Sequence, residues 1–355
     1  MKSDNSRVFE ELKDQISSFL SGEYYFLGKH LSGFEDEFAE FSKAPYCVGL
    51  SSGTVALQLL LRSLHLPSGS EILVSSFCPI PTVMGILEAG LIPRFVDIQA
   101  DTLMPNAKNF ASRYQKSCKG LMVVHIFGKI SPMSEILEFA SSENLPVIED
   151  ACQACGAIGE DHIPSRKTVG AAMSFYPTKV LGAWGDAGAV LTEREELANE
   201  LRQLRNYGLD DEFKNQSLGG NYRMDDLQAL VLQEKLKHLG KYISQGREIA
   251  NCYRQELPLR GFQYRSEGEL ANEHVISYLL RDKDSKEKIR KKFRERSLRS
   301  SFHYDYPVYF HQALQCFQKR ELPVVRDVSS RIINLPEDTQ KMGDELTTLI
   351  SELSA

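Results

Sequence analysis

The sequence lacks a long hydrophobic run and has no excess of basic residues. A helix that spans a bilayer needs about 20 consecutive apolar residues, and no segment approaches that length. Residues 1–7 are polar and lack the apolar stretch of a signal peptide. Lys and Arg number 42 against 48 Asp and Glu, so the formal net charge is −6. These absences argue against membrane and nucleic-acid partners, and we expect a cytoplasmic protein.

Cysteine is sparse as well, with seven residues scattered over a chain of 355. A disulfide framework is typical of short secreted chains, whereas an odd number of cysteines in a long chain fits free thiols in a reducing compartment. Cys152 and Cys155 form a C-x-x-C pair, but the sequence has no second pair of that kind. A structural zinc site usually takes more such ligands, so we expect no bound metal.

What the chain does contain is a regular alternation of strand-like and helix-like segments. The predicted strands are residues 46–50, 71–75, 92–98, 120–126, 146–149, 172–175 and 187–192. The predicted helices are residues 8–20, 55–64, 81–89 and 131–141, and a further helix from Ser32 with Glu35 completing a capping box. This alternation predicts an α/β fold with a mostly parallel central sheet flanked by helices. The last two strands have no helix between them, so part of the sheet is expected to be antiparallel.

The length of 355 residues suggests roughly two domains, because a domain usually has ~100–200 residues. From Met224 the pattern changes to a long helical stretch that runs towards Gln255, with breaks near Gly240 and Gly246. We therefore predict a large domain, residues 1–240, and a smaller C-terminal α/β domain, residues 241–355. The small domain has strand candidates at 275–280 and 301–303, and a basic segment at 283–299 that is interpreted as a solvated helix face.

The first candidate functional segment ends the strand at 46–50 and opens the helix at 55–64. Unpaired backbone N–H groups and the helix dipole make such a start an anion site. Gly53 lets an oxyanion approach the backbone, and the hydroxyls of Ser52 and Thr54 can donate further hydrogen bonds. For this segment taken alone, an ordinary serine or threonine N-cap is the better explanation.

The second candidate is Asp150, which follows a buried apolar strand. An acid at the carboxyl end of a parallel strand lies where open α/β sheets place ligands. A buried aspartate needs a cationic or hydrogen-bonding partner, and a protonated pyridine nitrogen would be one. A helix N-cap aspartate is the alternative.

The third candidate is Lys179, which lies after a short apolar strand and before a glycine-rich loop. A lysine so placed can form a Schiff base with an aldehyde, although most lysines are solvated surface residues. A phosphate cradle, an acid that pairs with a pyridinium and a Schiff-base lysine follow one another in this order. Pyridoxal 5′-phosphate (PLP) needs all three, so this cofactor is the hypothesis that accounts for them together.

At these residues the chain resembles the DegT/StrS family of PLP-dependent sugar aminotransferases, which have the aspartate aminotransferase (type I) fold. The resemblance runs from Gly28 and Phe34-Glu35 to Ile333-Asn334-Leu335-Pro336. The matching motifs are Ser51-Ser52-Gly53-Thr54, Ala89-Gly90 with Pro93 and Val96-Asp97, His125-Ile126-Phe127-Gly128, Glu149-Asp150 through Ala157, Ser174 through Lys179, Asn221-Tyr222-Arg223-Met224, and His303-Tyr304.

The resemblance implies a role for each matching residue. Lys179 would carry the Schiff base and move protons, and Asp150 would pair with the pyridine nitrogen. The residues implied in holding the rest of the cofactor are Ser52, Gly53, Thr54 and Ser174 at the phosphate, Gln153 at the phenolic oxygen, and Cys152 on one ring face. Asn221 would reach the cofactor of the neighbouring subunit, which implies a homodimer with shared active sites. Substrate contacts are hypothesised for Trp184, Arg223, His303 and Tyr304.

The chain also departs from the family pattern. Pro79 stands where an aromatic side chain commonly stacks on the cofactor ring, so ring stacking is lost. Lys129 and Ile130 replace a usual Gln-Pro, and Gly220 stands where an aromatic residue is common. These changes leave the cofactor chemistry intact but leave the substrate open.

The resulting hypothesis is a PLP-dependent aminotransferase that moves an amino group from an amino acid, glutamate by family resemblance, to a nucleotide-linked keto sugar. An aminotransferase for a non-nucleotide keto sugar or a cyclitol is an alternative. A sugar dehydratase is disfavoured because that branch of the family has histidine in place of Lys179. A non-catalytic PLP-binding or regulatory protein is an alternative of another class, and Pro79 is the one feature in its favour.

Overall fold

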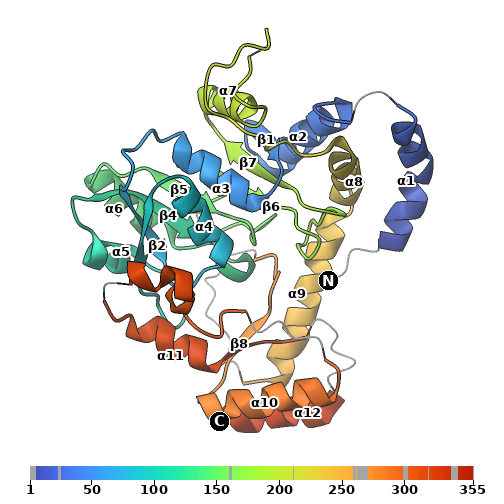
Figure 1. Ribbon diagram of the computed structural model, residues 1–355. Coiled ribbons are helices and arrows are strands. Elements are labelled where there is room, and N and C mark those ends of the chain that lie inside the picture. Colours follow the sequence, from blue (N-terminus) through green and yellow to red (C-terminus); the bar gives the residue numbers. More distant parts are fainter. Residues whose placement is uncertain are drawn as a thin grey trace.

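The computed structural model has a seven-stranded sheet in the order β1-β7-β6-β5-β4-β2-β3 (Figure 1). The structure describes residues 5–22, 25–159, 162–210, 212–258, 261, 271–298, 303–318, 320–336 and 343–354. The strands are β1 (Tyr46–Leu50), β2 (Glu71–Ser75), β3 (Ile92–Val96), β4 (Cys118–Val124), β5 (Val147–Asp150), β6 (Gly170–Ser174) and β7 (Gly188–Thr192). The pairs β2–β3, β2–β4, β4–β5 and β5–β6 are parallel, whereas β7 pairs antiparallel with β1 and β6. Both the mostly parallel sheet and its antiparallel part are confirmed.

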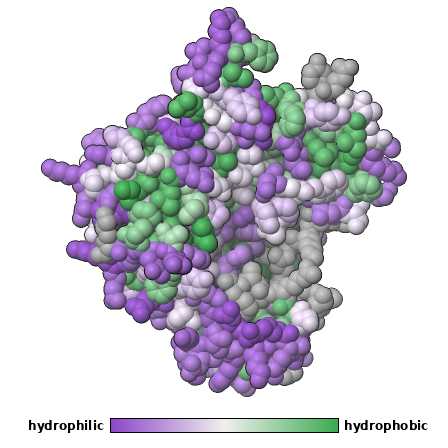
Figure 2. All heavy atoms as spheres, viewed as in Figure 1, coloured by the Kyte–Doolittle hydropathy of each residue, from purple (hydrophilic) through white to green (hydrophobic). Residues whose placement is uncertain are grey.

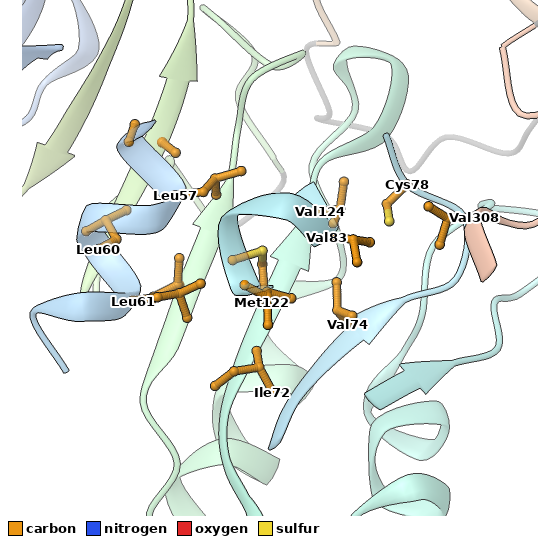
Figure 3. Packing of buried hydrophobic residues seen from close by; sticks show 14 of the residues in the cluster. Leu57, Leu60, Leu61, Ile72, Val74, Cys78, Val83, Met122, Val124 and Val308 are labelled. Atoms are coloured by element: carbon orange, nitrogen blue, oxygen red, sulfur yellow. The ribbon is translucent and has the colours of Figure 1, made fainter. Parts of the chain in front are cut away.

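Helices cover both faces of this sheet, and alternate residues of each strand point to opposite faces. The helices of this part are α1 (Asn5–Leu20), α2 (Lys29–Ser42), α3 (Gly53–Arg62), α4 (Ile80–Glu88), α5 (Ala107–Arg113), α6 (Met133–Ser142), α7 (Glu195–Leu204) and α8 (Asp226–Leu236), with a 3-10 turn η1 at Ile126–Gly128. On one face, Ile72 and Val74 of β2 pack with Met122 of β4 against α3 and α4 (Figure 3). On the other face, Leu73 of β2 packs with Leu121 and Val123 of β4 against α2 and α6. Burial on both faces is the reason these strands are almost uniformly apolar.

The N-terminus of α2 differs from the sequence prediction. The helix begins at Lys29 and not at Ser32, and its first backbone N–H groups are bound by a carboxylate from α8. Asp226 accepts hydrogen bonds from the amides of Gly28 and Leu31, each at 3.0 Å. Glu35 does not complete a capping box, because its buried carboxylate accepts from the amide of Gly49 at 2.7 Å. The cap of this helix is therefore a tertiary contact.

The chain crosses to its C-terminal part through two helices, α8 and α9 (Leu239–Glu256), which Figure 1 shows end to end. The predicted break near Gly240 is confirmed, because α8 ends at Leu236 and α9 begins at Leu239. The predicted break near Gly246 is wrong, because this glycine lies inside α9. Helices tolerate an interior glycine at a cost of about 1 kcal/mol, which packing can offset.

The C-terminal part combines a two-stranded sheet with helices. Its elements are β8 (Ser277–Leu279), α10 (Lys283–Glu295), η3 (Val308–Phe310), η4 (Gln312–Phe317), α11 (Pro323–Arg331), β9 (Ile332–Asn334) and α12 (Gly343–Ser354). The predicted strand at 275–280 is confirmed as β8, β9 was missed, and residues 301 and 302 of the predicted strand at 301–303 lie outside the described residues. The surface over α10 is hydrophilic (Figure 2), as expected for a solvated helix face.

The elements of this part belong to two separate hydrophobic clusters. Tyr253 of α9 packs in a cluster with Tyr278 of β8 and Phe293 of α10. In contrast, α11 packs against the main sheet, and Asp97 accepts the amides of Val324 and Val325 at its N-terminus, at 3.0 and 2.8 Å. A boundary at residue 240 stays a prediction. Among the described residues no helix is both long and apolar enough to cross a bilayer, and all seven cysteines are free, as expected.

Candidate active site

A cavity of about 660 Å³ opens at the carboxyl ends of the parallel strands. This is the edge at which open α/β sheets bind ligands. The cavity brings together most of the predicted site residues: Ser52, Gly53, Thr54, Pro79, Asp150, Cys152, Gln153, Ser174, Lys179, His303 and Tyr304. Segments separated by more than 200 residues of sequence, from 52 to 304, thus converge on one volume.

The N-terminus of α3 forms one wall of the cavity. Ser52 is the N-cap of this helix, and its hydroxyl accepts the amide of Val55 at 3.2 Å. A Cβ atom on Gly53 would lie 2.8 Å from the Cys152 sulfur and from the Ser174 Cβ. The chain therefore needs glycine here, and the exposed N–H groups of the helix start form an anion site. The N-cap interpretation and the phosphate-cradle interpretation are compatible.

Gly188 of β7 supports this turn from behind, since a Cβ atom there would lie 2.3 Å from the Ser52 carbonyl carbon. Replacing Gly188 with alanine is expected to displace the Ser52–Gly53 backbone and to weaken phosphate binding by roughly tenfold or more. Isothermal titration with PLP measures the loss. Gly240→Ala is the matched control, because no atom lies within 4 Å of its added methyl group. Equal affinities of the two variants for PLP would contradict a phosphate site at Ser52 and Gly53.

Asp150 ends β5 with its carboxylate almost completely buried, at 3% exposure. One oxygen, Oδ2, accepts the hydroxyl of Thr82 at 2.6 Å, and the other, Oδ1, accepts the amide of Cys152 at 3.1 Å. The residues after Asp150 form turns and not a helix, so the N-cap interpretation of Asp150 is wrong. A buried carboxylate with few donors can take a cationic partner from the cavity.

Lys179 lies half-buried in a turn after β6, and its amide donates to the Tyr176 carbonyl at 2.8 Å. Burial lowers the pKa of Lys179 below its ordinary value, although the nearby Cys152 and Asp150 act in the opposite direction. A lowered pKa increases the fraction of neutral amine, which is the nucleophilic form. The loop beyond Lys179 is held by Lys235 of α8, whose Nζ donates to the Gly182 carbonyl at 2.6 Å.

Gln153 connects the cavity floor to Tyr304. Its Oε1 accepts the amide of Phe127 at 2.7 Å, and its Nε2 donates to the Tyr304 hydroxyl at 2.9 Å. Tyr304 has a left-handed backbone with φ of 64°, and its ring lies 4.9 Å from that of Phe77. These two hydrogen bonds fix the orientation of the Gln153 amide, the group for which the family resemblance implies a cofactor contact.

Three predicted residues lie outside this chain's cavity. Trp184 was predicted to line it, but its indole N–H donates to Asn5 of α1 at 3.1 Å, and its ring packs near Phe9. The Arg223 guanidinium lies 5.4 and 5.2 Å from the ring centroids of Phe26 and Tyr207. Both side chains are held away from the cavity by other segments of the chain. Asn5 binds the Trp184 indole, and the rings of Phe26 and Tyr207 contact the Arg223 guanidinium.

Asn221, the third of these residues, pairs with Asn206 through an isolated antiparallel bridge on the exposed side of the 206–221 segment. The sequence hypothesis assigned it to the cofactor of a neighbouring subunit, and a position outside its own chain's cavity is compatible with that role.

Sequence reasoning missed two features next to the site. Thr82 and His274 line the cavity, and burial, followed by the charge of Lys179, holds the pKa of His274 well below its usual range. Neither residue stood out, because a threonine in a helix and a histidine in a loop are ordinary.

The second missed feature is a polar network behind the cavity. Oε2 of Glu149 lies 2.8 Å from Nε2 of both His125 and His162, and Oε1 accepts the Ser165 amide and the Thr168 hydroxyl at 2.8 and 2.7 Å. These three acid and histidine side chains have spacings that a metal could use. However, the Ser131 amide donates to Nδ1 of His125 at 3.1 Å. Nε2 is then the protonated nitrogen and has no lone pair for a cation, so the cluster is a hydrogen-bond network.

The seven-stranded, mostly parallel sheet with helices on both faces is the fold of the fold type I PLP-dependent aminotransferases. The chain belongs to the DegT/DnrJ/EryC1/StrS aminotransferase family, whose model matches residues 7–354. It is therefore a transferase enzyme, and the fold class expected from the sequence is confirmed.

Several relatives and solved structures are similar over nearly the full chain. A dTDP-3-amino-3,4,6-trideoxy-alpha-D-glucose transaminase from Micromonospora megalomicea subsp. nigra is 30% identical, over 92% of this chain and 89% of the relative. A UDP-N-acetyl-3-dehydro-alpha-D-glucosamine 3-aminotransferase from Acidithiobacillus ferrooxidans is also 30% identical, over 92% and 88%. The crystal structure of DesV from S. venezuelae has a TM-score of 0.90 at 29% identity and covers 99% of this chain and 97% of its own.

Proposed function

We propose that this enzyme uses PLP to transfer an amino group from an amino acid to a nucleotide-linked keto sugar. The observation that carries the proposal is the joint placement of Lys179, Asp150 and the α3 N-terminus around one cavity of about 660 Å³. The cofactor fits these residues, because the Gly53 backbone leaves room that a Cβ atom would fill. When bound, PLP supplies an aldehyde carbon and a ring that takes up the electrons of the breaking C–H bond.

Residues of the chain would bind the cofactor and transfer the proton. Lys179 would hold the cofactor through its aldehyde carbon, and its Nζ would be the general acid and base that carries the proton at the reacting carbon. Asp150 would accept a hydrogen bond from the ring N–H and so favour the charged ring. Ser174 and the α3 N-terminus would hold the phosphate, Cys152 and Pro79 would give apolar contact to the ring, and Gln153 would contact the phenolic oxygen.

A nucleotide-linked sugar is the substrate class that the relatives support. Their names specify dTDP- and UDP-linked sugars, and their identity to this chain is 30%. The nucleotide therefore differs among relatives that are equally similar to this chain. Glutamate is the proposed amino donor, and His303 and Tyr304, which line the cavity, are the proposed sugar contacts.

We also propose a homodimer in which Asn221 reaches the partner's cavity. Phe213 and Leu218, on the same segment as Asn221, are 82% and 84% exposed. Burial of these two apolar side chains by a partner would stabilise a dimer through the hydrophobic effect. A second copy would bury them and would bring Asn221 and Arg223 near the other cavity. Analytical ultracentrifugation checks this, and a monomer at micromolar concentration would contradict it.

An amino-transfer assay tests the proposed function. The purified enzyme with PLP is incubated with glutamate and with dTDP- and UDP-linked keto sugars, free keto sugars and a keto cyclitol, and 2-oxoglutarate is measured. Oxoglutarate release that depends on a nucleotide-linked sugar is the expected result. If 2-oxoglutarate is released only with the free keto sugar or the cyclitol, the proposed substrate class is wrong. Binding of PLP without transfer to any acceptor would favour the regulatory alternative.

A further inference from the structure

The first turn of α4 carries a hydroxyl group into the cavity wall beside Asp150. Thr82 is the third residue of this helix, which begins at Ile80, and its side chain is fully buried. Its Oγ1 lies 2.6 Å from Oδ2 of Asp150, the shorter of the two hydrogen bonds to that carboxylate. The two residues are 68 positions apart in the sequence and meet because β2 and β5 end at the same edge of the sheet.

The hydroxyl is the donor in this pair, because an ionised carboxylate can only accept. Hydrogen bonds to a charged acceptor are short and strong, and the 2.6 Å distance fits that class. The start of α4 also places the positive end of its helix dipole next to the carboxylate. With 3% exposure, Asp150 has little access to water that could replace the Thr82 donor.

We propose that Thr82 is a positioning residue that holds the Asp150 carboxylate aimed into the cavity, and thereby sets how firmly the ring nitrogen of PLP holds its proton. The inference rests on the proposed function and adds a residue that acts through Asp150. Loss of the hydroxyl makes the carboxylate a stronger base, so the shared proton moves towards Asp150 and the ring carries less positive charge.

Two variants separate the hydroxyl from the volume of the side chain. Thr82→Val keeps the shape without the donor, and Thr82→Ser keeps the donor with less volume. A less positive ring makes the Lys179 nitrogen a stronger base, so the pH midpoint of the visible absorbance of bound PLP is expected to rise by about one unit in Thr82→Val. The kcat is expected to fall about tenfold, whereas Thr82→Ser stays near wild type on both measures.

A double-mutant cycle makes the test specific to Asp150. In an Asp150→Asn background, Thr82→Val is expected to cause no further shift of the midpoint. If Thr82→Val does not fold, Thr82→Ala enters the same cycle. A wild-type midpoint in the folded Thr82→Val protein, or equal shifts in the valine and serine variants, would overturn the inference while leaving the proposed function intact. Failure of the wild-type enzyme to bind PLP would instead overturn the proposed function.

Discussion

Replacing Lys179 with alanine is expected to abolish amino transfer and to leave phosphate binding in place. The change removes the amine that attacks the cofactor aldehyde and the group that carries the proton, so kcat is expected to fall by more than about 10⁴-fold. The phosphate site is built from the α3 N-terminus around Gly53 and does not use Lys179. Glutamate-dependent oxoglutarate release measures the loss, and equilibrium dialysis with PLP measures the retained binding.

Two further variants sharpen this test. Lys179→Arg keeps a positive charge but lacks a nucleophilic amine, and it is expected to be as inactive as the alanine variant. Lys108→Ala removes a lysine that is exposed on α5, and it is expected to retain the wild-type rate. Borohydride reduction followed by peptide mass spectrometry should place the trapped cofactor on residue 179 of the wild-type chain. An adduct on a different lysine, or wild-type turnover by Lys179→Ala, would disprove the assignment.

The second large effect is on stability. Replacing Glu149 with glutamine is expected to lower the free energy of unfolding by about 3–5 kcal/mol at neutral pH. In either orientation of the glutamine amide its NH₂ group would face donors, which are the imidazole N–H groups of His125 and His162 or the backbone N–H of Ser165. A buried donor would then oppose buried donors, with no water to separate them.

This stabilisation depends on pH in a defined direction. Burial by itself raises the pKa of Glu149, but the hydrogen bonds from His125 and His162 outweigh it and lower the pKa from 4.5 to about 2. A carboxyl group with a lowered pKa in the folded state stabilises the fold above its unfolded pKa and loses that contribution as the pH falls through the folded value. The difference between wild type and Glu149→Gln should therefore be complete above pH 4.5 and shrink towards pH 2.

Urea denaturation followed by circular dichroism at a series of pH values measures this difference. Glu138→Gln on the exposed side of α6 is the matched control and is expected to change stability by no more than about 0.5 kcal/mol. Equal urea midpoints for wild type and Glu149→Gln at neutral pH would contradict the role assigned to the network. A difference that stays constant in acid would show that its origin is not the charge of Glu149.

The local sequence contained the information for the strands and for three parts of the site. Each strand of the main sheet is a short apolar run bounded by turn residues, and burial on both faces requires that composition. Ser52, Asp150 and Lys179 were identifiable because each is a polar residue of defined chemistry at the end of such a run or within five residues of it. The strand order β1-β7-β6-β5 brings the carboxyl ends of β1, β6 and β5, and with them these three residues, to one edge of the sheet.

Only the tertiary structure decided which side chains pair across that edge. The donor to Asp150 comes from 68 residues away, the cap of α2 from 195 residues away, and the partner of the Trp184 indole from 179 residues away. A hydrophobic pattern or a propensity describes a few neighbouring residues, whereas such contacts depend on strand order and register. The sequence therefore determined which reactive side chains lie near the ends of the strands. Packing determined how deeply each one is buried and which hydrogen-bond partners it meets.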